Sequence, residues 1–231
     1  MIQTKQDLGV VRDYYTAQRA VSRDEESIYA IWERGEAFND SVTPSTYVPE
    51  YRSHMLLKLM SLTKDDAGVF SFGCGNGFVE GDLAGLGRTV RAIDFNEEAV
   101  ELTRNKGVDA FRADYYELTA TDLEGIDAVY ADGFLGHLFD SQDELRPALG
   151  KLESFGLKSG TKLLFSNDAP FDPEAAFEPH HRVKDFWFLS KDYLQKSLES
   201  FGFSSVESYY FPYQRPVSGM RNRTICVVRV P

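Results

Sequence analysis

Hydrophobic and polar positions follow two rhythms along the 231 residues. From about residue 69 to residue 167, short apolar runs alternate with longer stretches in which apolar residues recur every three or four positions. The first rhythm is typical of buried strands and the second of amphipathic helices. Their alternation predicts a mostly parallel sheet with helices on both faces. The expected strands are residues 69–72, 89–94, 108–114, 126–132 and 161–167.

Three helices are expected before the first of these strands. Residues 5–20 carry a helix-compatible pattern. A second helix is expected to open at Ser22, because Glu25 stands in the capping-box position three residues later. Turn-forming residues then interrupt the pattern, and residues 50–62 resume it.

The end of the chain changes from alternation to two consecutive strands. A helix that Ser190 can cap is followed by residues 204–214 and 224–230, and no helix separates these two segments. Strands joined in this way are expected to pair antiparallel. No repeat, low-complexity tract or linker divides the chain, so we expect one domain. It would consist of a helical N-terminal part (residues 1–50) and an α/β core (residues 51–231).

The charge balance argues against a nucleic-acid substrate. Asp and Glu outnumber Lys and Arg by 36 to 25, which gives a formal net charge of −11 and a field that repels phosphate backbones. Arg215, Arg221 and Arg223 form the one short basic cluster, and they are interpreted as solvated charges in a loop. We therefore expect no nucleic-acid partner.

Neither a membrane nor an oxidising compartment is indicated. The N-terminus lacks the apolar core of a signal peptide, and the chain has no run of about 18 apolar residues that would span a membrane. Cys74 and Cys226 are the two cysteines, and both lie in or beside apolar, strand-like segments. We expect no disulfide and no cysteine-based metal site, and a cytoplasmic location fits this pattern.

A glycine-rich turn follows the first expected strand. In GVFSFGCGNGFVEGDL, residues 68–83, glycines at alternate positions let backbone N–H groups at the start of the next helix approach a ligand. The phosphate loop of nucleotide hydrolases would need Gly-Lys-Ser/Thr, which is absent, and the dinucleotide fingerprint would need Gly or Ala where Phe78 stands. A third interpretation is a G-x-G-x-G loop that holds a nucleoside with an amino-acid tail and no phosphate.

This turn and four later segments resemble the class I S-adenosylmethionine-dependent methyltransferases. The segments are FGCGNG, RAIDFNEEAVELT, FRADYYEL, DAVYADGFLGHLFD and LKSGTKLLFSN, in the order and spacing of that family, and the resemblance extends over residues 56–230. It implies a doubly wound, mostly parallel seven-stranded α/β sheet with an antiparallel C-terminal strand pair. It also implies S-adenosylmethionine as the cofactor and an N-terminal helical lid over it.

The resemblance further implies where the cofactor binds. Asp94 ends the second strand, where its carboxylate can accept hydrogen bonds from both vicinal ribose hydroxyls. Asp114 is similar to the residue that accepts from the adenine amino group. The backbone of Tyr115 and the ring of Tyr116 or Phe95 are placed to contact the adenine. The cofactor-binding residues implied in this way are Gly73, Cys74, Gly75, Asn76, Asp94, Phe95, Asp114, Tyr115 and Ala131.

One position departs from the family pattern. The residue two before the first glycine, usually an acid that helps to organise the methionine amino group, is Ser71. The contact is then left to backbone carbonyls, water or another acid, and Asp132 after the fourth strand is one candidate. This departure is the feature that favours a non-catalytic module which keeps the cofactor fold.

The methyl acceptor is expected beside the carboxyl ends of the first and fourth strands, where open α/β sheets bind ligands. His137 in the loop there resembles a histidine of small-amine methyltransferases. A near-neutral imidazole would take a proton or orient the acceptor, and the alternative is a histidine satisfied by the backbone. Asp132 would meet a cationic acceptor or the cofactor's ammonium. Tyr14, with Tyr15 beside it, would approach the methyl group from the lid. We predict His137, Asp132 and Tyr14 as the catalytic residues.

Aromatic residues 186–188 are expected to wall a small-molecule pocket. His180 and His181 would point apart on a strand, so no metal site is expected. The sequence thus predicts a methyltransferase of small molecules, with an amine or guanidine nitrogen ahead of an oxygen or carbon acceptor. A nucleotide-dependent oxidoreductase and the non-catalytic module are the rival interpretations. An N-terminal arm that closes its own or a neighbour's site also allows a homodimer.

Overall fold

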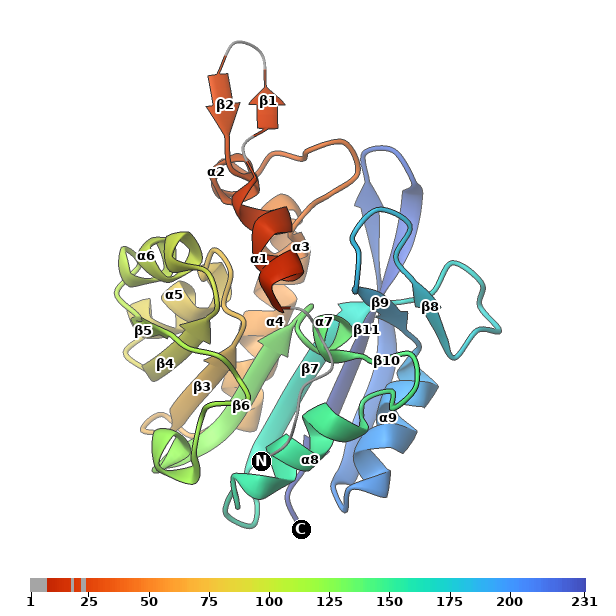
Figure 1. Cartoon of the computed structure of the whole chain (residues 1–231). Coiled ribbons are helices and arrows are strands. Elements are labelled where there is room, and N and C mark those ends of the chain that lie inside the picture. Colours follow the sequence, from red (N-terminus) through yellow and green to blue (C-terminus); the bar gives the residue numbers. More distant parts are fainter. Residues whose placement is uncertain (1–7, 18, 22–23) are drawn as a thin grey trace.

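A seven-stranded sheet runs through the computed structural model, which describes residues 8–17, 19–21 and 24–231 (Figure 1). Its strand order is β10-β11-β7-β6-β3-β4-β5. Strands β3 to β7 run parallel to one another, whereas β11 pairs antiparallel with both β7 and β10. This confirms the expected fold class. The strands are β3 (Gly68–Phe72), β4 (Thr89–Asp94), β5 (Asp109–Arg112), β6 (Ile126–Asp132), β7 (Lys162–Asp168), β10 (Ser204–Arg215) and β11 (Gly219–Arg229).

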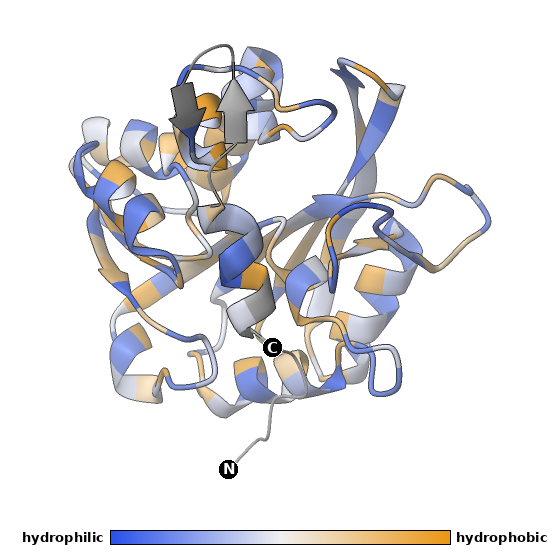
Figure 2. Ribbon diagram, turned by 45° about the horizontal axis from the view of Figure 1, so that its top comes forward, coloured by the Kyte–Doolittle hydropathy of each residue, from blue (hydrophilic) through white to orange (hydrophobic). Residues whose placement is uncertain are grey.

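Helices cover both faces of the sheet. One buried cluster joins the sheet to α4 (Pro49–Leu62), α5 (Phe78–Gly85) and α6 (Glu97–Arg104), and a second joins it to α8 (Arg146–Ser154) and α9 (Lys191–Ser200). In Figure 1, α4 lies behind the sheet and α8 in front of it. The helices carry both hydrophobic and hydrophilic positions, because each packs one side on the sheet and turns the other away (Figure 2). The short helices α7 (Leu135–Leu138) and η1 (Ala120–Leu123) lie on the side of the sheet that α8 and α9 cover.

Strand β3 shows how the pleat assigns residues to the two faces. All five of its residues are buried. Phe70 and Phe72 belong to the cluster under α8 and α9, whereas Val69 belongs to the cluster under α4 and α5. Since successive side chains of a strand alternate, Ser71 shares the α5 face with Val69. A hydroxyl on an otherwise apolar face needs a partner there.

The N-terminal part differs from the expected helices. The first helix, α1, is Leu8–Thr16, and it is followed by the hairpin of β1 (Arg19–Val21) and β2 (Asp24–Glu26). The next helix, α2 (Ile28–Glu33), begins after Ser27, whose hydroxyl accepts from Ala30 N at 3.1 Å. Glu25 is therefore a strand residue and the predicted helix start was wrong; Ser22 lies outside the described residues. Together with α3 (Pro44–Tyr47), these elements lie beyond the carboxyl ends of the parallel strands (Figure 1).

Two further hairpins border the same end of the sheet. One is β8 (Phe177–Pro179) with β9 (Trp187–Leu189), and the other is the end of β10 and β11. Strand β11 starts at Gly219, five residues before the predicted start. Arg221 and Arg223 therefore lie in a strand and are 8% and 4% exposed. Their interpretation as solvated loop charges was wrong, and it was equally wrong for Arg215, which is 5% exposed.

Among the helices of the described residues, none combines the length and the apolar character that crossing a bilayer requires.

Candidate active site

The three glycines of the turn between β3 and α5 have different surroundings. Gly73, Gly75 and Gly77 all have positive φ angles, of 65°, 53° and 68°. A Cβ on Gly73 would lie 2.8 Å from the Phe134 ring, and one on Gly77 would overlap Thr103. A Cβ on Gly75 would meet no atom within 4 Å. Packing therefore requires the outer two glycines, whereas the middle one borders open space in which a ligand can approach the backbone.

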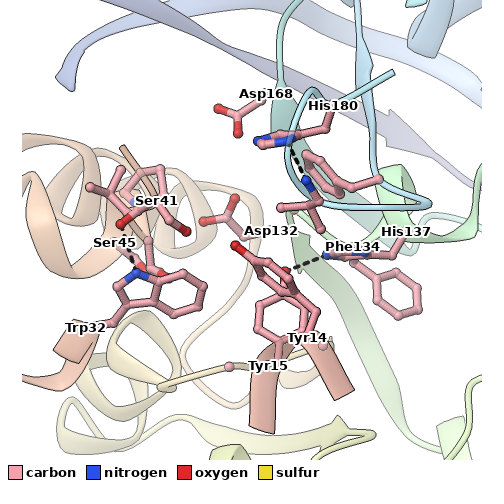
Figure 3. Close-up of a pocket in the computed structure, with 18 of the residues that line it drawn as sticks. Tyr14, Tyr15, Trp32, Ser41, Ser45, Asp132, Phe134, His137, Asp168 and His180 are labelled. Carbon is pink, nitrogen blue, oxygen red and sulfur yellow. Dashed lines mark hydrogen bonds between the residues drawn. The ribbon is translucent and has the colours of Figure 1, made fainter. Parts of the chain in front are cut away.

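That space is a cavity of about 460 Å³ at the carboxyl ends of β3, β4, β6 and β7. Its volume is within the range of about 300–1,000 Å³ that is usual for small-molecule sites. Side chains of α1, α2, residues 38–45, α7 and residues 180–188 enclose it. Figure 3 shows Trp32 and Ser41 on one side and His137 and His180 on the other, with Tyr14 and Tyr15 between them.

Asp94 ends β4 at the rim of this cavity. Its Oδ2 accepts from Gly75 N at 3.0 Å and its Oδ1 accepts from Asn96 N at 2.9 Å, so the turn and the carboxylate hold each other in place. Burial raises the pKa of Asp94, and the two backbone N–H groups oppose that rise. Each oxygen keeps a lone pair for the cavity. The geometry suits a vicinal diol, as the predicted ribose contact requires.

Glu80 is a cavity residue that the sequence prediction missed. It stands in the first turn of α5, and its Oε1 accepts a 2.6 Å hydrogen bond from Ser71 Oγ. Both residues are buried, at 4% and 1% exposure. Burial raises the pKa of Glu80 to about 7; the Ser71 hydrogen bond opposes this, and the charges of Asp132 and Asp94 add to it. The sequence signal that could have identified Glu80 was Ser71, which stands where the family usually has an acid.

Asp132 ends β6 and does not stand alone in the cavity. It forms an ion pair with Arg223, whose Nη1 also lies 3.0 Å from Oδ1 of Asp168. Arg215 Nη2 lies 2.6 Å from Oδ2 of Asp168. Although burial alone would raise the pKa of Asp168, the two guanidinium groups hold it well below its usual range. We call these four residues the arginine–aspartate cluster; Asp168, Arg215 and Arg223 were not predicted as site residues.

His137 lies on α7 and meets Tyr15 of the N-terminal helix. The Tyr15 hydroxyl is 2.7 Å from His137 Nε2 (Figure 3). The centre of the His137 ring lies 4.5 Å from that of Phe186. Burial lowers the pKa of His137 to about 3, so the imidazole is neutral at physiological pH and the expected near-neutral pKa was wrong. Its Nδ1 is buried and has no hydrogen-bond partner among the described residues.

Tyr14 and Tyr15 both line the cavity, but in different ways. Tyr15, which was considered for the site beside Tyr14 but was not among the predicted catalytic residues, reaches His137. Tyr14 packs edge-on against Tyr15 at 5.1 Å and contacts the apolar group formed by Val183, Phe186 and Phe188. Tyr14 thereby links α1 to the aromatic segment that was expected to wall a pocket.

The structure places the predicted residues in two groups. Those that line the cavity are Gly73, Cys74, Gly75, Asp94, Phe95, Asp132, His137 and Tyr14. Asn76, Asp114, Tyr115 and Ala131 are not among the lining residues.

The second group has structural contacts of its own. The Asn76 amide donates to Tyr29 O at 3.0 Å, Asp114 accepts from Tyr116 N at 2.9 Å, and the Tyr115 hydroxyl donates to Ala148 O at 2.9 Å. Ala131 is buried in the core. Their cofactor roles stay predictions.

The aromatic segment also divides. Phe186 and Phe188 line the cavity, whereas Trp187 packs against Phe139 and Phe177. His180 lines the cavity and its Nδ1 accepts from Val183 N at 2.9 Å. In the part of the chain that the structure describes, no three His, Cys, Asp or Glu side chains are grouped to hold a metal ion.

Comparisons with known proteins agree with this geometry. Residues 70–157 match the family described as "Methyltransferase domain". A "Tabtoxin biosynthesis enzyme" of Pseudomonas amygdali pv. tabaci is 58% identical over 226 residues, which cover 98% of this chain and 90% of the relative. The chain belongs to the class I S-adenosylmethionine-dependent methyltransferases.

Solved structures of this methyltransferase fold superpose well. Magnesium protoporphyrin IX methyltransferase from Synechocystis PCC 6803, with bound S-adenosylhomocysteine, has a TM-score of 0.67 at 16% identity and covers 97% of this chain and 100% of its own. A glycopeptide N-methyltransferase with bound S-adenosylmethionine has a TM-score of 0.57 at 16% identity, and covers 78% of this chain and 87% of its own. At these identities the likeness shows the fold.

The methyltransferase uses S-adenosylmethionine and acts on a small molecule. Its own residues fit that cofactor. The open side of Gly75 admits a ligand close to the backbone, and Asp94 offers two oxygens to a ribose. Glu80 adds a buried carboxylate, which suits a ligand with a cationic tail and would repel a pyrophosphate. This arrangement speaks against the rival interpretation as a dinucleotide-dependent oxidoreductase.

Proposed function

We propose that the methyltransferase transfers the methyl group to an amine nitrogen of a small metabolite. The supporting observation is that the polar groups on the aromatic wall of the cavity are held neutral. Burial raises the pKa of Tyr15, lowers the pKa of His137 to about 3 and lowers the pKa of His180 to about 4. The carboxylates of Asp132 and Asp168 are tied to arginines.

Neutral groups of this kind suit an amine better than an alcohol. An alcohol must lose its proton as it attacks and so needs a nearby base with a pKa close to the working pH, which neither histidine of the aromatic wall provides; Glu80, whose pKa is about 7, lies on α5 and not on that wall. An amine has a free lone pair once its ammonium has given its proton to water. An enclosed aromatic wall favours that uncharged form because burial penalises charge.

The protein's contribution to the reaction is then orientation and exclusion of water. S-adenosylmethionine supplies an activated methyl group for in-line displacement. His137 and Tyr15 form hydrogen bonds that orient the amine, while Phe186 and Phe188 fix its position and keep water out. Transfer would form a nitrogen–carbon bond and break the carbon–sulfur bond, and the methylated amine would give up its extra proton to water after product release.

Two further observations support a small metabolite as the acceptor. The relative from Pseudomonas amygdali pv. tabaci is named for the biosynthesis of tabtoxin, and that name favours a specialised metabolite for this chain as well. The net charge of −11 disfavours nucleic acid. We also propose one domain, in which residues 1–50 include the lid over the site and residues 51–231 the core.

The attacked atom can be identified directly. The protein is incubated with [methyl-¹³C]S-adenosylmethionine and a small-metabolite extract, and the product's ¹³C chemical shift is read by NMR. A methyl carbon attached to nitrogen is the expected result. A methyl attached to oxygen or carbon would overturn the proposal. Asp94→Ala, which we expect not to bind the cofactor, serves as the negative control.

A further inference from the structure

We propose that Glu80, held by Ser71, is the anion that binds the amino-acid ammonium group of the cofactor. A carboxylate from the helix would thus take the place of the strand acid that Ser71 replaces. The proposal concerns the cofactor alone, and it holds whichever atom of the acceptor is methylated.

The first argument is that Glu80 is a buried acid which lacks a cation. It is 4% exposed and lines the cavity. Ser71 donates to one of its oxygens, and no Lys, Arg or His among the described residues forms an ion pair with it. Two other acids of this end of the molecule are paired with arginines, Asp132 with Arg223 and Asp168 with Arg215, and Asp94 accepts from two backbone N–H groups. A buried carboxylate without a counter-ion is costly, and a ligand cation removes that cost.

The second argument is the position of Glu80 between two other ligand-facing acids. The strand order places β3 between β4, which ends in Asp94, and β6, which ends in Asp132. All three carboxylates line the same cavity, and the charges of Asp94 and Asp132 raise the pKa of Glu80. A nucleoside held at Asp94 would have its tail in the same cavity, which Glu80 also lines, so Glu80 would be available to bind the ammonium group of that tail.

The third argument is that Asp132, the acid predicted for this contact, is already engaged. Its carboxylate forms an ion pair with a 4%-exposed Arg223, which also donates to Ser166 at 3.0 Å. Binding a ligand ammonium there would compete with a guanidinium that cannot leave. Glu80 meets no such competitor, and the Ser71 hydroxyl fixes its rotamer.

Three cofactor probes separate the roles that Glu80 can play. S-adenosylmethionine carries an ammonium and a sulfonium, S-adenosylhomocysteine carries the ammonium alone, and 5′-methylthioadenosine carries neither. Calorimetry is performed with each probe on the wild-type protein and on Glu80→Gln, which preserves shape and removes charge. Thermal unfolding confirms that the variant is folded.

The expected result is a loss of about 10- to 100-fold in affinity for both charged probes, with 5′-methylthioadenosine unchanged. The matched control is Glu207→Gln. Glu207 is an acid on β10 that lies outside the cavity lining and is paired with Lys58 at 2.8 Å. It should leave all three affinities within about twofold. Unchanged affinity of Glu80→Gln for S-adenosylhomocysteine would overturn the proposal, because Glu80 would then face the sulfonium or the acceptor.

A measurement on the wild-type protein covers the case in which the variant does not fold. The affinity for S-adenosylhomocysteine should fall as pH decreases from 8 to 6, because Glu80 becomes protonated. The other titratable groups that face Glu80 are Asp94, Asp132, Tyr130 and Cys74, and burial raises the pKa of Tyr130 and Cys74 so that both stay neutral. Protonation of Asp94 would change the affinity for 5′-methylthioadenosine as much as the affinity for S-adenosylhomocysteine. An identical pH dependence for both probes would therefore refute the assignment.

Discussion

The Tyr15 hydroxyl lies 2.7 Å from Nε2 of His137, although 122 residues separate the two in the chain. Tyr15 belongs to α1 and His137 to α7, so this hydrogen bond connects the N-terminal helix to the loop after β6. Tyr15 also stacks on Tyr29 at 5.6 Å and packs on Trp32 at 5.9 Å. One side chain thus joins three segments over the cavity, which makes α1 part of the site.

Removing this hydrogen bond should impair turnover more than cofactor binding. We expect Tyr15→Phe and His137→Ala each to lower turnover about tenfold. The double variant should lose little more, because each substitution removes the same hydrogen bond. Steady-state kinetics with the acceptor and calorimetry with S-adenosylhomocysteine check this. Multiplicative losses in the double variant would show that the two side chains act separately.

Asp94→Asn should weaken S-adenosylhomocysteine binding about 100-fold or more. An amide presents one acceptor where two are needed, and its NH₂ group would face the Gly75 N–H that now donates to Oδ2 at 3.0 Å. Calorimetry measures the loss. Asp114→Asn is the comparison, because Asp114 lies outside the cavity lining, and its effect should be at least tenfold smaller. Near-normal affinity of Asp94→Asn would rule out the ribose contact.

The strands were predictable because parallel strands are buried on both faces. Each then has a continuous apolar run, as in β3, whose five residues are all buried. The Ser190 cap was also predictable, since one hydroxyl and the following amide decide it, and its Oγ accepts from Tyr193 N. The predicted cofactor residues Gly75 and Asp94 both line the cavity, because each stands at or just after the carboxyl end of a predicted strand.

The remaining features depend on tertiary contacts that a sequence does not show. Arg223 looks like a loop residue until β11 pairs with β7, which places it opposite Asp168. In the sequence, Glu80 resembles an ordinary acid in the first turn of a surface helix. The structure shows that it is buried and accepts a hydrogen bond from Ser71 on the strand beneath α5. The β1–β2 hairpin has no apolar alternation, so local pattern favoured a helix there.

Gly75→Ala should reduce cofactor affinity at a modest cost in stability. The new Cβ would enter the open space beside the turn, where we expect the cofactor to bind, and the positive φ of 53° would cost about 1 kcal/mol. Gly160→Ala is the matched control, because Gly160 also has a positive φ and open space around its Cβ position, but lies away from the cavity. It should lower the melting temperature similarly and leave calorimetric affinity intact. Equal affinities for both variants would contradict a ligand at Gly75.

Asp168→Asn should destabilise the protein strongly. Asp168 neutralises Arg215 and Arg223 and accepts from the Tyr213 hydroxyl at 2.6 Å, so its loss leaves buried guanidinium charge uncompensated. We expect the free energy of unfolding to fall by about 3–5 kcal/mol in urea titrations. Because the pKa of Asp168 is held below its usual range, its stabilisation is present above pH 4 and is lost as pH falls further. Asp65→Asn, in which a fully exposed carboxylate that pairs with Arg88 loses its charge, should change stability by less than about 1 kcal/mol. A loss no larger than in Asp65→Asn would contradict the role of the cluster.

Glu80→Gln should stabilise the protein without cofactor, although it weakens cofactor binding. The folded-state pKa of Glu80 is raised to about 7 by burial, above its ordinary 4.5. The protonated form is therefore favoured in the folded state, and stability is lost as pH rises from 4.5 through 7. At pH 8 the wild-type protein bears a penalty on the order of 1–3 kcal/mol that glutamine avoids. We expect the variant's melting temperature to be several degrees higher at pH 8, and the difference to shrink toward pH 5. Saturating S-adenosylhomocysteine should reverse the order at pH 8, because its ammonium neutralises the wild-type carboxylate and gives the amide nothing comparable. A variant less stable than wild type at pH 8 without ligand would show that Glu80 already has its counter-charge within the protein.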